Sequence, residues 1–277
     1  MPTNNKVALV TGASSGIGEA AARKLNELGY TVYGAARRVE RMKDLADAGV
    51  HVLAMDVTDA ESMTEGVRRI IEDNGRIDVL VNNAGYGSYG AVEDVPLAEA
   101  RAQFEVNVFG AAQLIQLVAP HMRAQGSGRI VNITSMGGKI YTPFGGWYHG
   151  TKFALEALSD ALRNELRPFG VDVVVIEPGA IRTEWGGIAA DNLRRTSGTG
   201  AYAKSVDRMA TTMSRGARPG SRLGSDPKVI ASAIARAATT RRPRIRYAVG
   251  MGAKPAIFLR WLLPDRAFDG LLRLGLG

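Results

Sequence analysis

Short runs of apolar residues alternate along the chain with longer segments in which apolar residues recur every three or four positions. The short runs predict buried strands, at Val7–Val10, Thr31–Ala35, Val50–Ala54, Val79–Val81, Arg129–Ile133, Val171–Ile176 and Ile245–Val249. The longer segments predict amphipathic helices, at Gly16–Leu28, Arg38–Ala48, Ala60–Asn74, Leu97–Ala124, Tyr148–Leu166 and Pro227–Thr239. The last of these has Ser225 or Asp226 as its expected N-cap. Alternation of this kind is typical of a parallel sheet whose two faces are both covered by helices.

The chain of 277 residues suits one domain of this class. No Pro-rich, Ser-rich or single-charge block divides it in the way a linker would. We therefore predict a single α/β domain over residues 1–277, with a Rossmann-type, doubly wound, seven-stranded parallel sheet. A ligand is expected beyond the carboxyl ends of the strands.

Two segments depart from the alternation. Residues 183–224 are polar, rich in Gly, Ser and Arg, and too long for a bare connection, which predicts a substrate loop or lid, or an irregular helical excursion. A floppy surface insertion is the alternative. Residues 254–277 form an amphipathic tail that could dock on the domain, pack on a second subunit or lie on an anionic membrane. Because Pro264 interrupts the helix that a membrane anchor would need, we expect docking rather than membrane contact.

Composition narrows the chemistry. The chain has no cysteine, which excludes disulfides, thiolate metal sites and a cysteine nucleophile, and its three histidines share no metal-ligand spacing. Its 35 basic and 27 acidic residues give a net charge of +8, which favours anionic partners. The chain has no basic run with interleaved aromatic residues, the pattern that would indicate nucleic-acid binding. The polar start, Met1 to Lys6, and the lack of a long apolar stretch predict a cytoplasmic protein without signal peptide or membrane span.

A glycine-rich turn follows the first strand and opens the first helix, with the sequence Thr-Gly-Ala-Ser-Ser-Gly-Ile-Gly from Thr11 to Gly18. Its glycines would let the backbone turn tightly and approach a pyrophosphate at the helix N-terminus. It lacks the Gly-Lys-Ser/Thr ending of nucleotide-hydrolysing loops, so kinase-like and GTPase-like functions are excluded. The turn therefore predicts a dinucleotide site that includes Gly12, Ser14, Ser15, Gly16, Ile17 and Gly18.

The choice of dinucleotide is made where the second strand ends. A carboxylate there would accept a hydrogen bond from a ribose 2′-hydroxyl, whereas an arginine would pair with a 2′-phosphate. The chain has Arg37 and Arg38 and no acidic residue at this place. The sequence therefore predicts NADP(H) in preference to NAD(H), unless both arginines merely cap and solvate the next helix.

Tyr148 and Lys152 lie four residues apart in a predicted helix, which places them on one face. A phenol titrates near pH 10, too high for efficient proton transfer at neutral pH unless a cation stabilises the phenolate. Lowering its pKa by about three units requires about 4 kcal/mol, within reach of a partly desolvated ammonium together with an oxidised nicotinamide. The alternatives are a surface pair of Lys152 with Glu156 and a tyrosine at the edge of the core.

Together these motifs resemble the short-chain dehydrogenase/reductase family. The glycine turn, Asn82-Asn83-Ala84-Gly85, Asn107, Ser135, Tyr148-x-x-x-Lys152 and Pro178-Gly179 follow one another in the family's order between Lys6 and Thr183. Residues 161–179 look like the hydroxysteroid and retinol dehydrogenase-like subgroup. The resemblance implies an oxidoreductase that interconverts a carbonyl and a secondary alcohol, a carbonyl reductase or alcohol dehydrogenase. An epimerase or dehydratase, or a dinucleotide-binding regulator, on the same fold is the alternative.

The resemblance also implies a role for each catalytic residue. Tyr148 would donate a proton to a carbonyl oxygen, or take one from a hydroxyl. Ser135 would hold the substrate oxygen, with Thr134 as the alternative if the register differs by one. Lys152 would bind the nicotinamide ribose and tune the phenol, and Asn107 would hold a water that links Lys152 to solvent.

The expected cofactor contacts extend along the chain. The resemblance implies that Asp56 and Val57 face the adenine, for which a cap on the following helix is the alternative role of Asp56. Asn83, Ala84 and Gly85 would lie by the adenine ribose. The nicotinamide end would contact Tyr148, Lys152, Pro178, Gly179, Ile181 and Thr183.

An aromatic, largely apolar set suggests a wall for a bulky lipophilic substrate, although core packing is the alternative for each member. The expected substrate contacts are Ser135, Tyr141, Phe144, Tyr148 and Trp185, and the wider set adds Tyr86, Trp147 and Ile188. His149 is expected to be a bystander because neighbours on a helix point in different directions. The resemblance implies a homodimer or homotetramer that uses the long helices after the fourth and fifth strands.

Overall fold

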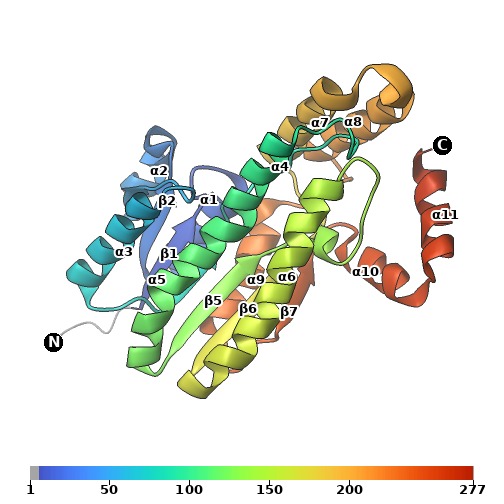
Figure 1. The fold of residues 1–277 in the computed structure, drawn as a ribbon. Coiled ribbons are helices and arrows are strands. Elements are labelled where there is room, and N and C mark those ends of the chain that lie inside the picture. The colour runs from blue at the N-terminus through green and yellow to red at the C-terminus, as the bar shows by residue number, and fades with distance from the viewer. Residues whose placement is uncertain (1–5, 277) are drawn as a thin grey trace.

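A computed structural model describes residues 6–276 and shows the predicted α/β architecture (Figure 1). Its seven strands form one parallel sheet in the order β3-β2-β1-β4-β5-β6-β7. The chain moves outward from β1 to β3 and then returns to β4, so the topological switch point lies between β1 and β4. The strands agree with the sequence expectation to within two residues: β1 Val7–Thr11, β2 Thr31–Ala36, β3 His51–Ala54, β4 Val79–Asn82, β5 Gly128–Ile133, β6 Val171–Pro178 and β7 Arg246–Val249.

The six predicted helical segments are all helical, with two internal differences. Residues 38–48 form a 3₁₀ turn followed by the short α2, and the predicted long helix is divided by a π-helical turn at Glu105–Phe109. Asp226 is the N-cap of α9, accepting the amide of Lys228 at 2.9 Å. The helices of these segments are α1 Gly16–Glu27, α2 Lys43–Asp47, α3 Ala60–Asn74, α4 Leu97–Phe104, α5 Gly110–Gln125, α6 Gly146–Leu166 and α9 Pro227–Thr239.

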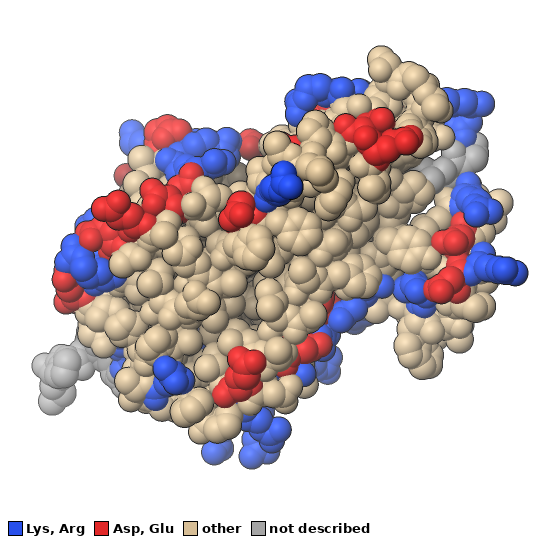
Figure 2. Space-filling model, viewed as in Figure 1, with Lys and Arg blue, Asp and Glu red and all other residues tan. Residues whose placement is uncertain are grey.

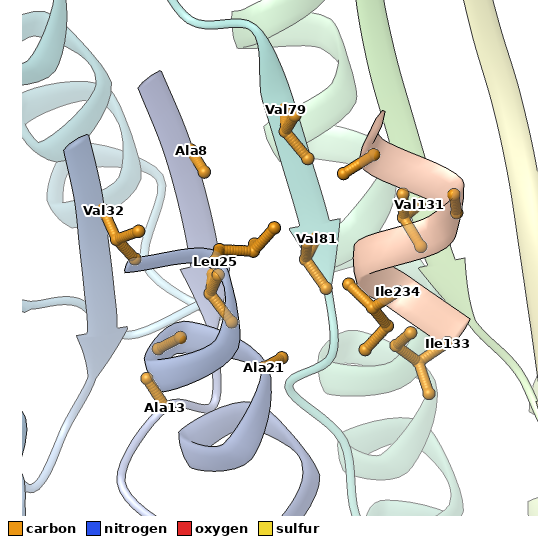
Figure 3. Close-up of a cluster of buried hydrophobic side chains, with 14 of the residues drawn as sticks. Ala8, Ala13, Ala21, Leu25, Val32, Val79, Val81, Val131, Ile133 and Ile234 are labelled. Atoms are coloured by element: carbon orange, nitrogen blue, oxygen red, sulfur yellow. The ribbon is translucent and has the colours of Figure 1, made fainter. Parts of the chain in front are cut away.

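Helices cover both faces of the sheet, which is why its strands are almost entirely apolar. On one face α1 and α9 pack against the strands, and Figure 3 shows Leu25 of α1 and Ile234 of α9 lying over Val81 and Val131. On the other face α3, α5 and α6 enclose a second core (Figure 1). This double cover leaves the carboxyl ends of the strands as the edge where loops can form a site.

Residues 183–224 are helical rather than a floppy insertion. They form α7 (Glu184–Ser197) and α8 (Ala203–Ala217), which pack on each other through the fully buried Leu193, Val206 and Ala210. Each helix buries only a narrow stripe of side chains, and the remaining positions face solvent, which is why the segment is polar overall.

The tail forms α10 (Ala253–Leu262) and α11 (Asp265–Leu276), separated at Pro264. The tail docks on the rest of the domain through Ala253 and Phe268, which are buried. Other apolar residues of both helices are exposed. Met1 to Asn5, on which the expectation of no signal peptide rests, lie outside the described residues. Within residues 6–276, no helix has the length and apolar character needed to cross a membrane.

Candidate active site

The loops at the carboxyl ends of the strands, together with α7 and α8, surround a cavity of about 650 Å³. Most of the residues expected to bind cofactor or substrate lie around this one cavity, although they come from widely separated parts of the chain. Those in its wall are Gly12, Ser14, Ser15, Gly16, Ile17, Arg37, Arg38, Asp56, Val57, Asn83, Ala84, Gly85, Tyr86, Ser135, Tyr148, Lys152, Pro178, Gly179, Ile181, Thr183 and Trp185.

The glycine turn has the backbone geometry that a pyrophosphate site needs. Gly12 and Gly16 have φ angles of 67° and 59°, which favour glycine. The N-cap of α1, Ser15, makes no side-chain capping bond, so the first N–H groups of the helix remain available to an anion. Gly18, expected among the cofactor contacts, is instead outside the cavity wall. A Cβ there would lie 2.2 Å from the carbonyl oxygen of Gly12, so Gly18 lets the helix pack directly on the turn.

Thr11 fixes this turn to the loop after β4, a role that the sequence analysis missed. Its hydroxyl oxygen accepts from the amides of Asn83 and Ala84, each at 3.0 Å. The Asn83 side chain in return donates to the Thr11 carbonyl at 2.9 Å. The only signal in the sequence is a polar residue at the end of a buried strand.

The two arginines after β2 line the cavity beside Asp56 and Val57, the residues expected to face the adenine. The Arg37 side chain is 74% exposed and its Nη1 lies 3.9 Å from Asp56 Oδ2, so it can turn toward an incoming phosphate. Arg38 is the N-cap residue of the following 3₁₀ turn, without a side-chain capping bond, and both arginines are exposed to solvent. The cap proposed for Asp56 is wrong, because Asp59 caps α3 while Asp56 accepts from Thr58 in a local turn.

Tyr148, Lys152 and Ser135 meet beneath the other end of the cavity. Tyr148 and Lys152 are each 7% exposed, and the Lys152 Nζ lies 5.9 Å from the centre of the Tyr148 ring. Ser135 lies two residues past the end of β5, and its side chain hydrogen-bonds the Tyr148 hydroxyl. The Thr134 hydroxyl instead donates to Glu156 Oε1 at 2.7 Å, so Ser135 is the residue whose hydroxyl faces the phenol.

Burial shifts the pKa values of both α6 residues. It raises the pKa of Tyr148 to about 12, against the opposing effect of the Ser135 hydrogen bond, and lowers the pKa of Lys152 to about 8. The expected lowering of the phenol pKa is therefore not produced by the protein groups alone. At neutral pH the phenol carries its proton and the ammonium its charge, which is the state that can donate a proton to a carbonyl oxygen.

Glu156 does not form the surface pair with Lys152 that was the alternative. It is 3% exposed and accepts from Thr134, from Lys139 Nζ at 2.9 Å and from Arg246 Nε at 3.0 Å. Glu156 therefore connects the loop after β5 with β7 behind the site.

Asn107 lies beside Lys152, but outside the cavity wall. It sits on the π-helical turn, and its Nδ2 donates to the Tyr86 carbonyl at 2.9 Å and to Thr151 Oγ1 at 3.0 Å. Its Oδ1 accepts the Tyr86 amide at 3.0 Å. The side chain thus holds the loop after β4 against α6.

Two of the expected substrate contacts point elsewhere. The Tyr141 hydroxyl donates to Asp269 at 2.8 Å and its ring packs on Phe268, so it anchors the tail. Phe144 packs on Tyr202 at a ring separation of 5.7 Å. Trp147 and Ile188 are likewise absent from the cavity wall, whereas Trp185 lines it with its ring 5.2 Å from that of Tyr148.

The apolar wall is completed by residues that the sequence analysis missed. Met209 and Met213 lie one turn apart on α8, in a segment whose polar composition concealed the helix. Tyr89, Met136, Ile140 and Leu223 are further apolar members of the wall.

His149 has a structural connection to the site that the bystander expectation overlooked. The Thr142 amide donates to its Nε2 at 3.1 Å, so its Nδ1 carries the proton and donates to the Gly137 carbonyl at 2.9 Å. Burial lowers the pKa of this imidazole. His149 therefore holds the loop that begins at Ser135.

The sequence of the chain is similar to those of known proteins of one family. The sequence pattern of the family described as short chain dehydrogenase matches residues 6–192. A 3-ketodihydrosphingosine reductase of Bacteroides thetaiotaomicron is 36% identical over 276 residues, with 97% of each chain covered. An NADPH-dependent 3-dehydrocapnine reductase of Ornithobacterium rhinotracheale is 34% identical over 275 residues, with 95% of each chain covered.

Solved structures agree. A short-chain dehydrogenase from Streptomyces avermitilis has a TM-score of 0.81 at 36% identity, covering 99% of this chain and 97% of its own. A metagenomic short-chain oxidoreductase in complex with NADP has a TM-score of 0.69 at 30% identity, covering 88% and 96%. A short-chain dehydrogenase/reductase from Burkholderia phymatum in complex with NAD has a TM-score of 0.78 at 26% identity, covering 98% and 96%. Similar proteins thus bind either nicotinamide dinucleotide.

Proposed function

The chain belongs to the short-chain dehydrogenase/reductase family of oxidoreductases, and from this premise we propose that it interconverts a bulky lipophilic ketone and its secondary alcohol with NADP(H). The observation that carries the proposal is that the buried Tyr148 and Lys152 lie with Ser135 between the glycine turn and an apolar wall.

When bound, the nicotinamide would supply the hydride for the carbonyl carbon, and the chain would supply position and the proton. Ser135 donates a hydrogen bond to the substrate oxygen, and Tyr148 donates its proton to the same oxygen as the alcohol forms. Lys152 binds the nicotinamide ribose and holds a positive charge near the phenol, so the phenolate is stabilised as it forms. Asn107 keeps the loop after β4 in place beside Lys152. In the oxidation direction Tyr148 takes the proton from the alcohol.

The preference for NADP(H) rests on the end of β2. Arg37 and Arg38 follow β2 immediately and line the cavity. The strand therefore ends without an acidic residue that could accept a hydrogen bond from a ribose 2′-hydroxyl. The exposed Arg37 guanidinium can form charge-assisted hydrogen bonds with a 2′-phosphate.

The substrate class follows from the other end of the cavity. Trp185, Met209, Met213 and Leu223 form an apolar wall that suits an alkyl chain, and methionines adapt to chains of different shape. The names of the two relatives identify 3-ketodihydrosphingosine and 3-dehydrocapnine as their substrates. We infer a ketone on a long alkyl chain as the substrate of this protein.

The test is an assay of the purified protein with 3-ketodihydrosphingosine and with a short, water-soluble ketone, each with NADPH and with NADH. The expected result is NADPH oxidation that matches alcohol formation one to one, with a higher kcat/KM for the long-chain ketone. Isotope exchange at the carbinol carbon without net NADPH oxidation would favour the epimerase alternative. NADPH binding with no turnover of any ketone would favour the regulator.

We also infer assembly into a homo-oligomer through α5 and α6. The near face over these helices shows a broad area without charged side chains (Figure 2). Phe109, Phe153 and Leu158 on or beside these helices are between 44% and 55% exposed. Sedimentation of the wild type and of Phe153→Glu checks this, with a smaller particle expected for the variant.

A further inference from the structure

We propose that the outer face of α10 and α11 is a docking surface for an anionic membrane, from which the lipophilic substrate reaches the cavity. This C-terminal face consists of Lys254, Phe258, Trp261 and Leu262 on α10 and Arg266, Leu271, Arg273 and Leu274 on α11. The link to the substrate rests on the proposed function, whereas the docking surface itself does not.

Large apolar side chains of the C-terminal face are open to solvent. Trp261 is 78% exposed, Leu274 is 81% exposed and Phe258 is 56% exposed. On α10, Lys254, Phe258, Trp261 and Leu262 are spaced so that all four lie on one side of the helix. The Phe258 and Trp261 rings lie 5.9 Å apart. Aromatic rings beside a lysine are the arrangement found where helices lie in a membrane interface.

The unpaired charges of this face are positive. Arg260 and the two acidic residues of the tail are used internally, because Arg260 pairs with Asp265 at 2.7 Å and Asp269 accepts from Tyr141. Across residues 6–276, the structure shows no ion pair for Lys254, Arg266 or Arg273. Such charges are complementary to anionic lipid headgroups.

The C-terminal face adjoins the substrate end of the cavity. Arg260 lies over the rings of Tyr141 and Phe268, at 5.6 Å and 5.5 Å, which fastens the tail to the loop after β5. That loop, through Ile140, and the neighbouring α8, through Met213, both line the cavity. Figure 1 shows α10 and α11 projecting from the body on the side of α8. A lipid leaving a membrane under these helices therefore has a short path to Trp185 and Tyr148.

Pro264, which led us to expect no membrane contact, separates the two helices but leaves an exposed apolar face on each. A second copy of the chain is the competing occupant. A two-fold contact would place this face against itself and oppose its unpaired positive charges, which is unfavourable. An anionic bilayer meets the apolar side chains and the charges at once.

The experiment is co-sedimentation of the full chain with vesicles of phosphatidylcholine alone or mixed with phosphatidylglycerol. We expect binding to the mixed vesicles, weaker at high salt, and little binding to phosphatidylcholine alone. The double variant Phe258→Ser/Trp261→Ser should lower the partition coefficient more than tenfold, and Lys254→Glu/Arg273→Glu should lower it at least fivefold per residue changed. Leu28→Ser, at the exposed C-cap of α1, and Arg69→Glu, at an exposed site of α3, are the matched controls and should bind as the wild type does.

Sedimentation and activity separate the outcomes. Equal vesicle binding by the wild type and both double variants overturns the proposal, and so does dissociation of an oligomer by Phe258→Ser/Trp261→Ser without an effect on vesicles. The proposal is supported if the double variants lose turnover only of the long-chain ketone presented in vesicles and retain turnover of a short ketone. Vesicle binding by a protein that reduces no ketone would leave the docking surface standing and refute the proposed function instead.

Discussion

The Lys152 ammonium donates a hydrogen bond to the main-chain carbonyl of Ile133 at 3.0 Å, at the point where β5 ends. This bond joins α6, which carries Tyr148, to the strand that leads into Ser135, so one lysine links the two elements that position these side chains. The same position is almost closed to solvent, and burial lowers the lysine pKa to about 8. Function and stability are therefore opposed at this residue.

Replacing Lys152 with Met should make the protein more stable and inactive. The pKa of Lys152 falls from 10.5 to about 8 on folding, so burying its charge costs about 3 kcal/mol below pH 8. Losing the bond to Ile133 costs about 1 kcal/mol, which leaves a net gain of about 2 kcal/mol. The gain should shrink as the pH rises from 8 toward 10.5, where the folded and unfolded wild type both lose the charge. Thermal melts across this range check it, with the exposed Lys204→Met as control.

Tyr148→Phe should retain NADPH binding and lose at least a hundredfold in kcat. The change removes the proton donor and leaves the ring, and general acid catalysis contributes about 10²–10⁴-fold. Stopped-flow turnover and NADPH fluorescence titration measure the two effects. Tyr33→Phe removes a hydroxyl of β2 that bonds Asp73 and Asn74 at the end of α3, outside the cavity wall, and should retain kcat. Retained turnover in Tyr148→Phe would refute the acid role.

Arg37→Ala should weaken NADPH binding by about 10–100-fold and leave NADH binding within twofold. Charge-assisted hydrogen bonds to a 2′-phosphate are worth about 1.5–3 kcal/mol, and NADH lacks that phosphate. Arg69→Ala, on α3, controls for loss of net positive charge. An unchanged ratio of the two dissociation constants would assign the choice of dinucleotide to other residues.

Glu177→Gln should raise the melting temperature at pH 8 and leave it unchanged near pH 4. Burial and the neighbouring Glu156 carboxylate raise the pKa of Glu177 from 4.5 to about 7. A carboxyl whose pKa is raised in the folded state does not lower the free energy of unfolding below pH 4.5, where it is protonated in both states. The full loss of stability, up to about 3 kcal/mol, is reached above pH 7, where the folded state also carries the charge. The exposed Glu165→Gln is the control. A gain of equal size at both pH values would show that charge burial is not the cause.

Gly18→Ala and Gly187→Ala should have opposite effects, although both positions are helical. A Cβ at Gly18 would meet the Gly12 carbonyl oxygen at 2.2 Å, so this change should destabilise the fold and disturb the glycine turn. A Cβ at Gly187 meets nothing within 4 Å, so that change should stabilise α7 by about 1 kcal/mol. Chemical denaturation and NADPH titration of both variants provide the comparison. Normal NADPH affinity in a folded Gly18→Ala would show that the turn tolerates the added methyl group.

The strands and the glycine turn could be predicted because local patterns encode them. An apolar run of strand length is buried whichever neighbours it has, and a tight turn needs its glycines in place. The spacing of Tyr148 and Lys152 likewise fixes one helix face without reference to the rest of the chain. By contrast, α7 and α8 bury only a narrow stripe each, so composition alone disguised them as a loop.

The sequence by itself thus determined the order of the elements, the dinucleotide turn and the paired phenol and ammonium, because each depends on residues that are close along the chain. Only the tertiary structure decided that Tyr141 faces Asp269 of the tail instead of the cavity, and that Met209 and Met213 take its place in the wall. It also decided that Glu156 bonds Thr134 and Arg246 instead of Lys152. The direction in which a side chain points depends on partners that folding brings from distant parts of the chain, and the spacing of neighbouring residues carries no record of them.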